Sequence, residues 1–144
     1  MMRAFAVVAV MAASVSAAPV PKELKKSGSL DGLWEITAME TFGLSQPVVK
    51  QHWRIEGDKI TVEQSVPNGA PRVRPAIAIK VDATATPKSL DYNTARVRAT
   101  RLAIYEVDGD SLRILMAGTG RAERPKEMKP DERMMLYTFK RVKE

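Results

Sequence analysis

The stretch Leu30-Asp31-Gly32-Leu33-Trp34-Glu35-Ile36 decides the fold of this chain. It places a Gly-x-Trp pattern, formed by Gly32 and Trp34, at the start of a segment in which apolar and polar residues alternate. A period of two is typical of a β-strand that buries one face. Strand-like segments follow it, and none shows the pattern of a long helix. The stretch therefore predicts the first strand of an all-β domain.

Period-2 runs rich in β-branched and aromatic residues continue along the chain. Their apolar faces are Trp34, Ile36 and Ala38; Val49, Trp53 and Ile55; Ile60 and Val62; Ile77, Ile79 and Val81; Leu112, Ile114 and Met116; and Met135, Tyr137 and Phe139. The segment 95–107 is less regular, and it predicts either two partly covered faces or a bulge near Thr100. With a short strand at 89–92, the count reaches about eight strands, which is enough to close a small barrel.

Prolines and glycines separate these runs. All nine prolines fall between them, as expected because proline cannot donate a hydrogen bond to a strand ladder. The tight-turn sequences at 56–59 and 108–110 predict that the runs on either side of each turn pair with each other. We therefore expect a single antiparallel barrel over residues 30–144.

Residues 1–17 have the features of a cleaved secretory signal peptide. Arg3 is followed by an apolar run from Ala4 to Ala13 and by the small residues Val15-Ser16-Ala17. The run is shorter than the about 20 residues of a membrane-spanning helix, so we expect no stable membrane span. Cleavage after Ala17 leaves a polar tether at 18–29 before the barrel. The expected location is secreted or periplasmic.

Composition limits the chemistry. The chain has no cysteine, which excludes disulfides, cysteine-ligated metals and thiol catalysis. Its net charge of +6 attracts anionic partners only through weak long-range forces. An arginine group is spread through the sequence, but it lacks the interleaved aromatic residues that nucleic-acid binding favours. We interpret it as a solvated face and expect no nucleic-acid partner; its members are Arg72, Arg74, Arg96, Arg98 and Arg101.

Two candidate catalytic features have simpler interpretations. His52 is the only histidine and shares its strand face with Arg54 and Glu56, so it is expected to face solvent and to bind no metal. Asp82 and Asp91 flank a proline-containing turn and would suit the acid and base of a hydrolase. Aspartates in turns more often accept hydrogen bonds from nearby backbone amides. We therefore expect no catalytic residue, no metal and no cofactor.

Seven blocks, namely 30–35, 53–60, 81–82, 86–91, 104–112, 124–125 and 136–141, resemble in sequence and order a lipocalin-like domain of unknown function that occurs in many exported planctomycete proteins. The resemblance covers almost all of the chain after the signal peptide, and it departs from the family at Ala103, where the family usually has glycine. It implies a barrel and an exported location, and it carries no established activity.

The chain is also similar to lipocalins at Gly32, Trp34 and Arg141. In lipocalins such a tryptophan closes one end of the barrel, and an arginine from the last strand stacks on it. A guanidinium over an indole ring is favourable by about 0.5–2 kcal/mol. The resemblance therefore implies a structural contact between Trp34 and Arg141, although the C-terminal helix of lipocalins is missing here.

These observations favour a non-enzymatic module that binds a small apolar or anionic amphipathic ligand. Pockets of this kind are mainly apolar with a few polar groups, and Arg101 would meet an anionic head group. The expected ligand-binding residues, all facing inward, are Trp53, Ile79, Arg101, Tyr105, Ile114 and Tyr137. The alternative is an envelope-associated structural or protein-interaction domain with a filled barrel, for which the sequence names no protein partner.

Overall fold

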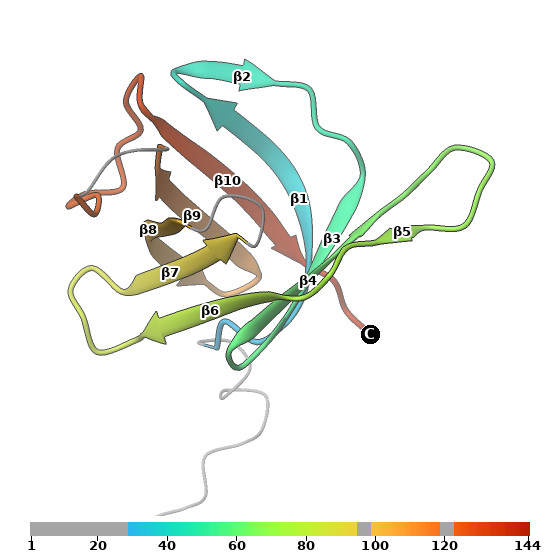
Figure 1. The fold of residues 1–144 in the computed structure, drawn as a ribbon, viewed down its shortest axis with the longest axis horizontal. Coiled ribbons are helices and arrows are strands. Elements are labelled where there is room, and N and C mark those ends of the chain that lie inside the picture. The colour runs from blue at the N-terminus through green and yellow to red at the C-terminus, as the bar shows by residue number, and fades with distance from the viewer. Residues whose placement is uncertain (1–28, 95–98, 119–122) are drawn as a thin grey trace, which may run out of the picture.

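A computed structural model describes residues 29–94, 99–118 and 123–144. Within these residues it contains ten strands and no helix. Eight strands form a closed antiparallel barrel in the order β1, β3, β4, β6, β7, β8, β9 and β10, and β10 pairs with β1 to close it (Figure 1). The strands are β1 (Gly32–Thr41), β2 (Leu44–Gln46), β3 (Gln51–Glu56), β4 (Lys59–Gln64), β5 (Arg72–Val73), β6 (Ile77–Asp82), β7 (Ser89–Thr94), β8 (Ala99–Asp108), β9 (Ser111–Ala117) and β10 (Met134–Arg141).

The all-β, lipocalin-like barrel predicted from the sequence is confirmed, and so are the two predicted tight turns. Glu56 pairs with Lys59 and Asp108 pairs with Ser111, so that each turn is a two-residue loop. Gly57 and Gly109 occupy the first loop positions with φ values of 59° and 57°, a conformation that favours glycine and fits the strand twist. The seven prolines of the described residues lie outside all ten strands.

Two expected core residues are exposed. A register shift between Ile36 and Ala38 moves Ala38 to the solvent side, and Met39 packs against the core instead. The prediction for Val49 was also wrong, because β3 begins only at Gln51 and the Val49 side chain is 52% exposed. After β2 the chain reaches Pro47, which cannot donate to a ladder, so the strand is interrupted before β3.

The sequence pattern of segment 95–107 was irregular, and its described part within β8 is covered on both faces. β8 pairs with β7 and β9 without a register shift, so there is no bulge near Thr100. Tyr105 is buried inside the barrel, while Ile104 and Leu115 are fully buried on the outer side. The segment 123–128 lies over this outer face, because Arg124 donates to the carbonyl of Ala103. The expected strand start at 95–98 lies outside the described residues.

The strands run alternately up and down, so their connections divide between two ends of the barrel. We call the end where β1 begins and β10 finishes the closed end; it also carries the connections 57–58, 83–88 and 109–110. We call residues 42–50 and 65–76, at the opposite end, the rim. Figure 1 shows the β1–β2 hairpin and the β4–β5 hairpin of the rim extending beyond the barrel.

Candidate functional site

The closed end is covered by Trp34, Arg141 and Leu30. The Trp34 ring is fully buried, and its Nε1 donates to the Leu30 carbonyl at 2.9 Å. The Arg141 guanidinium lies over this ring, 4.1 Å from its centroid, and donates to the carbonyls of Asp31 and Ser29 at 2.9 Å each. The contact predicted between Trp34 and Arg141 is therefore present, and the residues act as a structural plug.

The plug explains why the Gly-x-Trp pattern begins with glycine. Gly32 has a φ of 136°, which L residues rarely adopt. A Cβ at this position would lie 2.8 Å from Nη1 of Arg141, in the path by which the guanidinium reaches the Asp31 carbonyl. Glycine at position 32 thus leaves room for Arg141, the last residue of β10, to form a hydrogen bond to the chain just before β1.

An aromatic cluster fills the middle of the barrel. The Trp53 ring lies 4.9 Å from Phe139, 5.5 Å from Tyr137 and 6.2 Å from Tyr92, measured between centroids. These separations are those of aromatic rings in contact. Ile114 is fully buried and Ile79 almost so. Trp53, Tyr137, Ile79 and Ile114, all expected to face inward, belong to or pack against one core.

Arg101 reaches this core from the rim side of β8. Its Nη1 lies 3.9 Å from the sulfur of Met116 and 3.8 Å from the sulfur of Met135. No carboxylate of the described residues lies within 4.0 Å of its guanidinium. A thioether is a weak acceptor, so this half-buried cation lacks a strong acceptor within the described part of the chain.

Two tyrosine hydroxyls add donors beside Arg101. The Tyr137 hydroxyl donates to the sulfur of Met135 at 3.7 Å, so this sulfur faces two donors. Burial raises the pKa of Tyr137, and burial together with the nearby Tyr137 raises the pKa of Tyr92 to about 12. Both hydroxyls therefore keep their protons at neutral pH. We call Trp53, Tyr92, Arg101, Met116, Met135 and Tyr137 the donor cluster, which has several donors and few acceptors.

Tyr105 belongs to the same buried core as Trp53 and Tyr92, and it lies four residues beyond Arg101 along β8. It lines a hollow of about 360 Å³ on the barrel surface, beside the β6–β7 connection and Met128. Burial, and secondarily the charge of Asp82, raise the pKa of Tyr105. A neighbouring hollow of about 480 Å³ lies beside Arg124 and Lys126. The sequence pattern placed Tyr105 inside the barrel with Trp53 and Tyr137, and in the structure it is buried in the core that contains Trp53 and against which Tyr137 packs.

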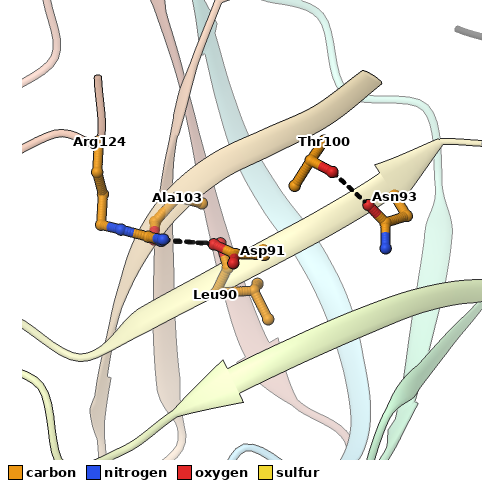
Figure 2. Close-up of polar contacts among 6 residues, drawn as sticks. All are labelled: Leu90, Asp91, Asn93, Thr100, Ala103 and Arg124. Atoms are coloured by element: carbon orange, nitrogen blue, oxygen red, sulfur yellow. Dashed lines mark hydrogen bonds and ion pairs between the residues drawn. The ribbon is translucent and has the colours of Figure 1, made fainter. Parts of the chain in front are cut away.

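Arg124 is an anchoring residue that the sequence analysis did not single out for any role. Its Nη2 lies 2.5 Å from Oδ1 of Asp91, and its Nη1 donates to the Ala103 carbonyl at 2.8 Å (Figure 2). These contacts fasten segment 123–128 to β7 and β8 and cover Ile104. The only signal in the sequence was the Arg124-Pro125 block of the family resemblance, which carried no partner for the arginine.

The two aspartates proposed as an acid and a base have separate structural partners. Oδ1 of Asp82 accepts hydrogen bonds from the hydroxyl and amide of Thr84 at 2.6 and 3.0 Å and from the amide of Ala85 at 3.2 Å. The hydroxyl of Thr84 is the main cause that lowers the pKa of Asp82. Asp91 pairs with Arg124. Asp82 therefore has the turn role expected from the sequence.

His52 is half-buried on β3, where it pairs in register with Glu35 and Glu63. No group of three or more His, Asp or Glu residues suited to hold a metal ion occurs in residues 29–94, 99–118 and 123–144.

The described part of the chain also contains no helix with the length and apolar character needed to cross a membrane.

Comparison of the sequence with protein-family models and with curated proteins, and a search of solved structures, give no significant match.

Proposed function

We propose that this protein is a non-enzymatic binding module for a small anionic amphipathic molecule, whose head group binds to Arg101 in the donor cluster. The observation that carries the proposal is that Arg101 and the Tyr137 hydroxyl converge on one thioether sulfur, that of Met135. A carboxylate or phosphate is a much better acceptor for these donors than a sulfur, because hydrogen bonds to ionised groups are about twice as strong as neutral ones.

The cluster also suggests how an apolar chain would enter a packed barrel. Met116 and Met135 lie next to Arg101 and are almost completely buried. Methionine side chains are unbranched and adaptable, and they are common on surfaces that repack around ligands. The ligand chain would displace these two side chains, while the rigid rings of Trp53 and Tyr92 would form its wall. Rotamer changes of this size are common on binding.

Ligands of matched chain length test the head-group preference. We expect dodecanoate and dodecyl phosphate to shift or quench the fluorescence of Trp53, which lies in the cluster, whereas dodecyltrimethylammonium has no effect. Arg101→Met should weaken binding of the two anions at least about tenfold, since a hydrogen bond to a charged group contributes about 1.5–3 kcal/mol. The affinities are measured by fluorescence titration.

The matched control is Arg113→Met, which removes one cation from the outer face of β9, where Arg113 pairs with Glu106. It changes the net charge by the same amount and should leave the affinities unchanged. Equal weakening by both substitutions would mean that net charge, not the cluster, attracts the anions. Failure of every anion to bind would overturn the proposal.

The second candidate is an envelope-associated structural or protein-interaction domain with a filled barrel. The observation that favours it is the contact of Trp53 with three aromatic rings in the middle of the barrel. Such a domain would bind none of the ligands above, and Arg101→Met would change neither its stability nor its contacts with partners. The titration therefore separates the two candidates.

We also propose that the protein is exported and belongs to the planctomycete-type lipocalin-like family that it resembles. Support for export is the order of Arg3, the apolar run and Val15-Ser16-Ala17. We expect the exported protein to begin at Ala18. N-terminal sequencing of that fraction checks this, and a start at Met1 would contradict it.

A further inference from the structure

The exposed apolar side chains of the barrel gather on the rim. In residues 29–94, 99–118 and 123–144, every large hydrophobic side chain classed as exposed lies there: Phe42, Leu44, Val48, Val49 and Val73. The two parts of the rim are joined, because the Ser65 amide donates to the Lys50 carbonyl at 3.0 Å. Scattered exposed apolar residues are normal, but a group confined to one end indicates a contact surface.

The backbone at the tip of the rim strengthens this interpretation. Phe42 and Gly43 form the two-residue loop between β1 and β2, with φ values of 54° and 78°. Positive φ values at both positions favour glycine, asparagine or aspartate, and a bulky residue there is strained. The Phe42 side chain is 53% exposed, so burial offsets little of this strain. Conformational strain of this kind concentrates at functional positions.

Charge distinguishes the two ends of the barrel. The rim contains Lys50, Arg72 and Arg74 and no acidic residue. At the closed end, Asp58 and Asp110 lie in turns, and three more aspartates lie beside the connections at positions 31, 82 and 108. Lys88 lies within one of those connections, and Lys59, Lys140 and Arg141 lie in strand ends at the same end of the barrel. The β9–β10 connection begins and ends at the same end of the barrel as the rim, and its residues 123–133 contain four basic and four acidic residues. The net charge of these described loop residues is therefore +3, which favours a negatively charged partner.

We propose that the rim is a docking surface for an anionic lipid bilayer. Exposed Phe, Leu and Val side chains flanked by Lys and Arg are the composition that binds to the boundary between head groups and acyl chains. The basic residues approach the anionic head groups while the hairpin tips enter the apolar layer. The proposal concerns a different surface from the donor cluster and does not depend on a ligand inside the barrel.

Vesicles of two compositions test the proposal with the whole mature chain. We expect the protein to sediment with vesicles of phosphatidylglycerol and phosphatidylcholine in equal amounts, and much less with vesicles of phosphatidylcholine alone. Added salt should release it, because screening shortens the range of the attraction. Equal binding to both compositions would overturn the proposed role of the rim cations.

Paired variants place the contact on the rim. Lys50→Gln with Arg72→Gln should weaken binding about 25-fold, since each cation near an anionic surface contributes about fivefold. Leu44→Ser with Val49→Ser should weaken it at least about tenfold through lost apolar burial. The matched control is Lys88→Gln with Lys140→Gln, which removes two exposed cations near the closed end and should leave vesicle binding unchanged.

Other occupants of the rim give different results. A dimer through the rim would be detected by sedimentation equilibrium and would be lost in the variant with Leu44→Ser and Val49→Ser. Such a dimer, without vesicle binding, would overturn the proposal. Arg101→Met should retain vesicle binding even where it loses ligand binding. A loss of vesicle binding in Arg101→Met, with the rim variants unaffected, would instead place the lipid contact at the donor cluster.

Discussion

Replacing Trp34 with alanine is expected to destabilise the barrel by about 3–5 kcal/mol, the usual cost of truncating a large buried aromatic side chain. Trp34 is fully buried and pairs in register with Arg141 on one side and Trp53 on the other. Its loss opens a cavity where the barrel closes and removes the donor to the Leu30 carbonyl. Urea unfolding followed by circular dichroism measures the change without relying on tryptophan fluorescence.

A double-mutant cycle with Arg141→Ala separates stacking from the rest of the plug. Arg141→Ala alone should cost about 1–3 kcal/mol, through lost stacking and lost hydrogen bonds to Asp31 and Ser29. The guanidinium stacks on the indole ring, so the two losses should fall short of additivity by about 0.5–2 kcal/mol. Strictly additive losses would show that Arg141 acts only through its hydrogen bonds, and an unchanged midpoint in either single variant would contradict the plug.

The contact between Trp34 and Arg141 was predictable because both residues lie in regular strands. A period-2 pattern fixes which residues face inward, and the order of an up-and-down barrel brings the first and last strands together. Trp34 and Arg141 follow from these two facts and from the resemblance to lipocalins. The bond from Arg141 to the Ser29 carbonyl did not follow, because it depends on the path of the chain before β1.

Predictions failed where the backbone leaves that regular pattern. The bulge after Ile36 exchanges the inward-facing and outward-facing positions in the rest of β1. As a result, Ala38 is exposed and Met39 packs against the core. A one-residue shift has this effect wherever the side-chain period is two. The expectation that Val49 would be buried was also wrong, because β3 starts two residues after Val49. The rim consists largely of such irregular chain, so its apolar tips could not be inferred from periodicity.

The candidate site was predicted in part. The alternation of side chains placed Arg101 on the inward face of its strand with Tyr105, but it could not show that two methionine sulfurs are its hydrogen-bond acceptors. That fact depends on which rotamers meet across β8, β9 and β10. The alternation also placed Tyr105 inside the barrel, and it is buried in the same core as Trp53. Alternation carries no information on height along the barrel axis, so it could not show that Tyr105 also lines the hollow beside residues 85–88.

Alkaline pH should destabilise the barrel through Tyr92. Its pKa is about 12 in the folded protein against an ordinary value of 10.0, so the folded state holds this proton more tightly than the unfolded state does. The contribution is fully present below pH 10 and is lost as the pH rises toward 12. Between the two pKa values the free energy of unfolding falls by up to about 1.4 kcal/mol per pH unit, and the loss reaches about 2 kcal/mol by pH 12.

Tyr92→Phe isolates this contribution, because phenylalanine keeps the ring beside Trp53 and has no proton to lose. The variant should lose about 2 kcal/mol less than the natural protein between pH 9 and pH 12, as measured by urea unfolding at each pH. Parallel losses in the two proteins would show that Tyr92 titrates normally. Ionised Tyr92 would place a phenolate anion near Arg101. We therefore expect anionic ligands to bind more weakly only at pH values at which this hydroxyl ionises.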